Sequence, residues 1–84
     1  MNLTQYTLTT ARITIVSSFV IDFFNTCSNV GIDEAVAQLE FEPARKAVRR
    51  WLQCIIEYAC TDDLRNEATV ALCEIDAMWE VPTC

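Results

Sequence analysis

Hydrophobic residues recur at helical spacing through most of this chain, and the pattern is clearest in its second half. Residues 43–60 place apolar side chains on one side of a helical wheel and charged ones on the other, which predicts an amphipathic helix with Pro43 in its first turn. Residues 62–80 predict a second helix, with Thr61 or Asp62 as its cap and Pro82 as its stop. The positions expected to face inward are Ala44, Ala47, Val48, Trp51, Leu52, Ile55, Tyr58, Ala59, Leu64, Ala68, Ala71, Leu72, Ile75, Met78 and Trp79.

The first third of the chain predicts a longer helix whose beginning is ambiguous. Apolar residues between positions 13 and 27 recur at spacings of three and four, which is typical of a helix over residues 4–29. This seam consists of Ile13, Val16, Val20, Phe23 and Cys27. Gly31 suits the left-handed position that ends such a helix. Threonines and other β-branched residues before Val20 favour a strand, so residues 10–16 could pair as one instead.

A short segment, residues 33–40, connects the first helix to the second, and Asp33 suits its N-cap. The chain has 84 residues, which leaves room for one core. Its one glycine and two prolines leave few residues for the tight turns of a many-stranded sheet. We therefore expect an all-α single domain over residues 1–84, a small helical bundle of three main helices plus one short connecting helix.

The charge balance excludes several classes of function. Twelve acidic residues against six basic ones give a net charge of −6, which argues against direct binding to a nucleic-acid backbone. The chain has no histidine, which is the commonest general base and the commonest metal ligand. It also has no glycine-rich phosphate loop and no Ser/His or Cys/His pair. We expect no enzymatic activity, no cofactor and no metal site.

The cysteines and the apolar runs bear on where the protein works. Five cysteines without a CxxC pair favour free buried thiols in a reducing cytosol. A disulfide among Cys54, Cys60 and Cys73 and a cysteine-only zinc site stay open as alternatives. The most apolar run, residues 13–24, is about twelve residues long and contains Asp22, whereas a membrane-spanning helix needs about 20. No secretory signal is recognisable, so we expect a cytoplasmic protein without membrane contact.

Four of the six basic residues lie close together in one predicted helix. They are Arg45, Lys46, Arg49 and Arg50. Ile56 falls on the same outer face, close in angle to the two arginines at positions 45 and 49, and an exposed isoleucine framed by arginines resembles a partner-binding patch. The alternatives are a solvated face that balances an acidic protein, or a contact with RNA or DNA.

The last predicted helix carries a second group of candidate partner-binding residues. Asp63, Glu67 and Glu74 line one edge of its wheel, beside a minor apolar stripe of Val70, Cys73 and Ala77. A helix with two apolar stripes can be touched from two sides. This face could meet a basic groove of a partner or the basic helix of a second copy, and the alternative is a set of small residues tolerated at the surface.

The first predicted helix has an apolar arc near 180° wide, while a surface helix usually needs little more than about 100°. The extra width predicts a second neighbour beyond the core of the monomer. Ile15, Phe19 and Ile21 are the candidate homodimer interface. The alternative is that this helix is simply the central helix of one chain.

In size and composition only, a small acidic helical chain without catalytic equipment resembles the inhibitor proteins carried by phages and mobile elements, such as anti-CRISPR proteins. No motif carries this resemblance. It implies steric binding to a surface of a larger protein or nucleoprotein complex. We therefore expect a non-enzymatic interaction protein, alone or as a homodimer. The alternatives are a small nucleic-acid-associated factor that uses residues 45–50, and a structural subunit of a larger assembly.

Overall fold

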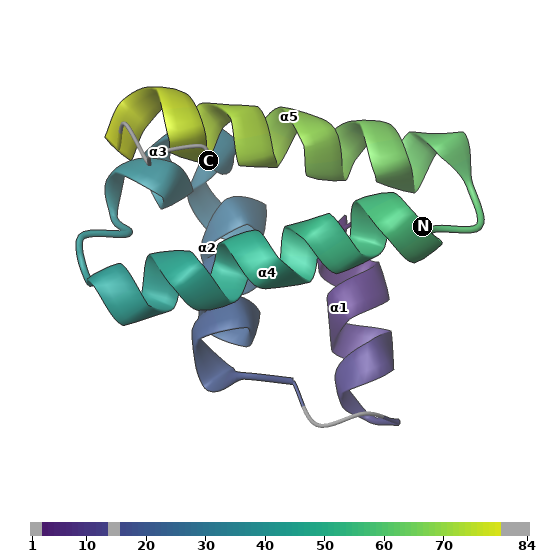
Figure 1. Ribbon diagram of the computed structural model, residues 1–84. Helices are drawn as coiled ribbons and strands as arrows, with labels where there is room; N and C mark the ends of the chain where they lie inside the picture. The colour runs from purple at the N-terminus through teal and green to yellow at the C-terminus, as the bar shows by residue number, and fades with distance from the viewer. Residues whose placement is uncertain (1–2, 14–15, 80–84) are drawn as a thin grey trace.

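The computed structural model describes residues 3–13 and 16–79, and it confirms the all-α class for them. This part of the chain forms five helices, whose arrangement is drawn in Figure 1. They are α1 (Leu3–Ala11), α2 (Ser18–Val30), α3 (Ile32–Ala37), α4 (Glu42–Tyr58) and α5 (Asp62–Trp79). The expected three main helices plus one short helix therefore describe the molecule only roughly, because the first predicted helix is two.

The helices are arranged around an antiparallel pair. Figure 1 shows α4 and α5 side by side in opposite directions, with α1 and α2 crossing α4 from behind and α3 beside the C-terminal end of α5. The core fills the space between these elements, and the largest fully buried side chains include Phe24, Val36, Leu52 and Ile75. None of the described helices is long and apolar enough to cross a membrane.

The break between α1 and α2 corrects the prediction of one helix over residues 4–29. Ile13 is 84% exposed, so the buried seam begins only at Val16, and residues 12–13 form a turn. Ser17 then caps α2, since its hydroxyl accepts a hydrogen bond from the backbone N–H of Phe19 at 3.3 Å. The strand alternative is wrong for residues 10–13, and residues 14 and 15 lie outside the described part.

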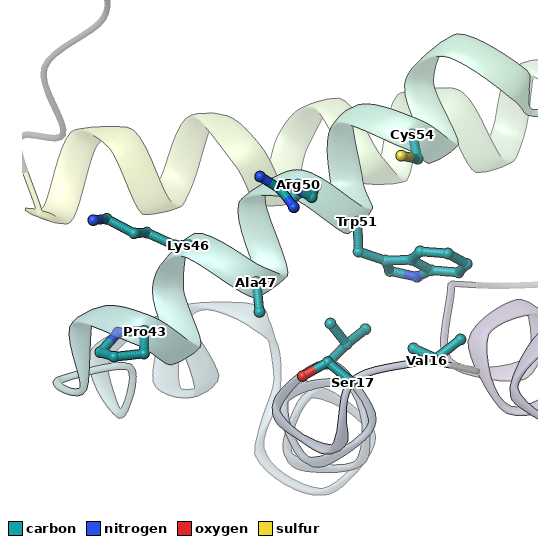
Figure 2. A pocket seen from close by; sticks show the side chains of 9 residues that line it. Val16, Ser17, Pro43, Lys46, Ala47, Arg50, Trp51 and Cys54 are labelled. Atoms are coloured by element: carbon teal, nitrogen blue, oxygen red, sulfur yellow. The ribbon is translucent and has the colours of Figure 1, made fainter.

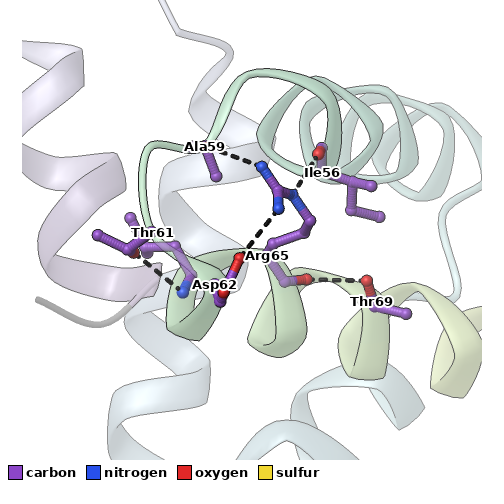
Figure 3. A network of polar contacts seen from close by, with 7 residues as sticks. Ile56, Ala59, Thr61, Asp62, Arg65 and Thr69 are labelled. Atoms are coloured by element: carbon purple, nitrogen blue, oxygen red, sulfur yellow. Dashed lines mark hydrogen bonds and ion pairs between the residues drawn. The ribbon is translucent and has the colours of Figure 1, made fainter.

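Three of the remaining helix ends follow the sequence signals, whereas α3 begins at Ile32, with Asp33 in its first turn and not at its N-cap as expected. Gly31 has a φ of +92° and its N–H donates to the carbonyl of Cys27, as expected for a glycine that ends a helix. Pro43 lies in the first turn of α4. Thr61 accepts the N–H of Leu64 at 3.3 Å and so caps α5 (Figure 3).

Two residues expected to face inward do not. Tyr58 and Met78 are both exposed. Each lies in the last turn of its helix, α4 or α5, where the neighbouring helix no longer covers it.

One buried polar contact ties the first helix to α4. Thr7 is fully buried, and its hydroxyl oxygen accepts the indole N–H of Trp51 at 3.1 Å. The ring of Tyr6 lies beside the same indole, with 6.3 Å between the ring centroids. α1 therefore fixes the orientation of a large side chain on α4.

We expect Thr7→Val to destabilise the fold by about 1–2 kcal/mol, because it keeps the shape of the side chain but leaves the indole N–H of Trp51 without an acceptor. Thr9→Val is the matched control, since Thr9 is on the same helix and exposed. Urea denaturation followed by circular dichroism measures both. Equal midpoints for the two variants would show that the hydrogen bond contributes nothing.

Candidate binding groove

The fold sorts the four clustered cations of α4 into two pairs, and the first pair serves the fold itself. Arg45 donates to the carbonyl oxygens of Leu39 and Glu40, both at 2.9 Å, and its guanidinium lies 4.5 Å from the ring centroid of Trp79. Arg49 pairs with Asp76 through a 2.9 Å contact between Nε and Oδ1, and these side chains are only 20% and 27% exposed. Both arginines thus hold α4 to neighbouring elements.

Ile56 is not the exposed isoleucine that the sequence suggested. It is half-buried and packs against the core. Its carbonyl oxygen accepts the Nε–H of Arg65 at 3.1 Å, and Arg65 also bonds Ala59 and Asp62 across the α4–α5 turn (Figure 3). The expected patch of Arg45, Arg49 and Ile56 is therefore covered by α5, because each of the three contacts a residue of that helix.

The second pair of cations, Lys46 and Arg50, borders an open groove between α4 and the start of α2. The groove has a volume of about 520 Å³. Figure 2 shows Ala47 and Trp51 pointing from α4 toward the start of α2. Its lining residues are Val16, Ser17, Val20, Pro43, Lys46, Ala47, Arg50, Trp51 and Cys54. This lining contains two cations and no acidic residue, and we call it the α2–α4 groove.

The two cations of the groove are available to a partner. Lys46 lies 3.3 Å from Glu42, but these side chains are 75% and 64% exposed, so the pair is weak and easily exchanged. Arg50 is exposed and makes no ion pair or hydrogen bond with the residues that the structure describes. The groove therefore offers a cationic edge above an apolar floor.

The acidic candidate residues lie on the outer side of α5. Asp63 is exposed and Glu67 and Glu74 are half-buried, and none of the three forms an ion pair with another described residue. The minor stripe of Val70, Cys73 and Ala77 is exposed. The exposed residues of this face are thus uncovered in the monomer, as the two-stripe pattern suggested, while Glu67 lines a separate, smaller pocket of about 330 Å³ that α5 shares with α1 and α2.

The candidate dimer residues are only partly placed. Ile15 lies outside the described residues. Phe19 is exposed and lies beside Phe41, with 5.7 Å between the ring centroids, while Ile21 is half-buried. Phe41 is 59% exposed, so this aromatic pair stands at the surface near the start of α4.

The structure describes four of the five cysteines. Cys27 and Cys54 are half-buried and Cys60 and Cys73 are exposed, so these four are free as expected, but none of them is fully buried. Cys84 lies outside the described residues. Residues 3–13 and 16–79 contain no group of three or more His, Cys, Asp or Glu side chains placed to hold a metal ion.

Comparison with protein-family models, with curated protein sequences and with solved structures finds no match to this chain. The groove and its charges are therefore what supports a functional proposal.

Sequence reasoning missed the groove as a unit. It assigned Trp51 and Ala47 to the core, considered Cys54 only as a thiol, and gave no role to Ser17. One signal was present, since Ala47 falls at the edge of the apolar arc of α4, on the side of the exposed Arg50.

We expect the first pair of cations, Arg45 and Arg49, to respond to charge reversal differently from the second pair, Lys46 and Arg50. The double variant R45E/R49E should lose about 2 kcal/mol of stability or more, because it places carboxylates against the carbonyls of Leu39 and Glu40 and against Asp76. K46E/R50E should stay within about 1 kcal/mol of the wild type, since both residues are exposed and the variant loses only the weak surface pair of Lys46 with Glu42. Urea denaturation measures the stability of both double variants. Equal losses of stability would contradict the assignment of the first pair of cations to the fold and of the second pair to the free surface.

A second prediction concerns thiol reactivity. Burial raises the pKa of the Cys27 thiol from its ordinary value of 9.0 to about 11, partly offset by a backbone hydrogen bond. At roughly pH 8 iodoacetamide should therefore alkylate Cys27 at least about tenfold more slowly than Cys60, as peptide mass spectrometry would measure. Because the fold holds this proton more tightly than the unfolded chain, the associated stability is present below pH 9.0 and is lost as the pH rises toward about 11. Equal alkylation rates would contradict this environment.

Proposed function

We propose that this chain is a non-enzymatic interaction protein that acts by steric binding to a larger protein or nucleoprotein complex, and that it binds through the α2–α4 groove. One observation carries the proposal. Arg50, without a polar partner among the described residues, and the weakly paired Lys46 border an apolar lining that contains no acidic residue, in a chain whose net charge is −6. An inhibitor of the phage or mobile-element type, working in the cytoplasm, fits this proposal.

The groove has the properties of an interface centre. Trp51 is among the residue types that contribute most to binding energy when a partner covers them. Its indole is held by Thr7 and Tyr6, so little conformational entropy remains to be lost when a partner docks. A standard interface covers about 800 Å² on each partner. The chain exposes 5437 Å² in all, so an interface of that size centred on the groove would leave most of the molecule free to block neighbouring sites.

A homodimer is the second candidate, and the exposed aromatic pair of Phe19 and Phe41 favours it. Such a dimer would use the Phe19 and Ile21 side of α2. It would not use the groove itself, because a two-fold contact there would bring the cations of both copies face to face.

Affinity capture from an extract of cells that carry this gene tests the proposal. Three baits are compared: the wild type, the groove variant K46E/R50E, and the variant D63K/E74K, which reverses two charges on the outer face of α5. We expect a protein or nucleoprotein that the wild type and D63K/E74K retain at equal yield and that K46E/R50E loses by about tenfold, the effect of removing roughly 1.4 kcal/mol of binding free energy.

The reverse pattern, with loss only from D63K/E74K, would assign binding to α5 instead. Equal yields from all three baits, or capture by none of them, would also contradict a groove-based function.

A further inference from the structure

The dimensions of the α2–α4 groove match one segment of helix. Its lining on α4 runs from Pro43 to Cys54, eleven residue steps that span about 17 Å at the helical rise. A partner helix of about three turns would lie along that length.

The walls of the groove favour a helix over a strand. A partner strand binds by pairing with a free row of backbone N–H and C=O groups at a sheet edge. The described chain offers no sheet, and most of the groove lining lies on α4, whose backbone groups bond within the helix; Val16 and Ser17, just before α2, add only a short non-helical stretch. Binding must therefore come from side chains, as when an amphipathic helix lies in a groove.

The charges of the groove specify the complementary face. Lys46 and Arg50 are four residues apart on one edge of α4, so their Cβ atoms are separated by about one helical turn. The apolar lining lies next to them and includes Val16, Val20 and Trp51. A helix that fits has carboxylates one turn apart, beside a stripe of aliphatic side chains.

The same charges argue against a nucleic acid as the occupant. Of the six basic residues, Arg45, Arg49 and Arg65 are engaged in contacts within the fold. Two of the others border the groove, in a chain that carries twelve acidic residues. A phosphate backbone is bound by several cations at once, and an acidic surface repels it.

We propose that the partner inserts an acidic amphipathic helix into the α2–α4 groove. Two carboxylates of that helix pair with Lys46 and Arg50, and one of its aliphatic side chains packs on Trp51. This inference rests on the proposed function and names the chemistry of the partner.

A peptide titration tests the proposal directly. The probe is a fluorescein-labelled peptide of about 14 residues, with leucines every three or four positions and glutamates at four-residue spacing beside them. The control peptide has lysine in place of each glutamate. A single-stranded oligothymidine of equal negative charge represents nucleic acid. Fluorescence anisotropy at low salt measures all three.

We expect the glutamate peptide to bind the wild type at least tenfold more tightly than the lysine peptide or the oligothymidine, and K46E/R50E to reverse the preference between the two peptides. D63K/E74K should bind the glutamate peptide within twofold of the wild type, although its net charge is less negative. That control separates binding in the groove from general attraction. In an NMR titration the indole N–H signal of Trp51 should shift, and that of Trp79, which donates to the carbonyl of Val36, should not.

Equal binding of both peptides, tighter binding of the oligothymidine, no saturable binding of the glutamate peptide, or an unchanged Trp51 signal would each overturn the proposal. The proposed function of the groove and the proposed chemistry of its partner can fail separately. If K46E/R50E loses the captured partner while the glutamate peptide does not bind, the groove keeps its function and only the acidic helix is wrong. If capture is unaffected by K46E/R50E, the proposed function fails as well.

Discussion

The antiparallel contact between α4 and α5 determines which charges of this chain are free. α4 turns by about 100° per residue, so Arg45 and Arg49 point one way and Lys46 and Arg50 point about 100° further round. α5 packs over the first direction and supplies Asp76 and the ring of Trp79 to the first pair. The second pair has no neighbour in the described chain that neutralises it fully. The edge to which we assign binding thus arises because the fold uses two of these four charges for its own packing.

The groove beside that edge depends on the interruption of the first apolar segment. The chain turns after α1, and α2 begins directly after its cap, Ser17. This path brings Val16 and Ser17 opposite α4. α1 then reaches α4 through the hydrogen bond between Thr7 and Trp51. The groove is therefore open to solvent, while the hydrogen bond to Thr7 fixes the indole of Trp51 that lines it. A preorganised side chain of this kind lets a small domain bind without first rearranging.

Local signals predicted the local structure well. The two amphipathic helices, the turn at Gly31, the first-turn proline at Pro43 and the cap at Thr61 are confirmed, because each depends on residues within a few positions of one another. The break before α2 was missed because the spacing of three and four residues continues through it. The local signs against a continuous helix are the β-branched residues before Val20, which we interpreted as a possible strand, and the capping serine, Ser17.

The candidate site was harder to predict, since it depends on contacts between residues far apart in the sequence. Arg49 meets Asp76 and Trp51 meets Thr7 only once the helices pack. Hydroxyl-radical footprinting of the chain with its captured partner tests the central claim most directly. If the partner occupies the α2–α4 groove, Trp51 and Pro43 are protected from oxidation while the exposed Tyr58 and Met78 react as in the free protein. Protection confined to Val70 and Cys73, with Trp51 unchanged, would contradict it.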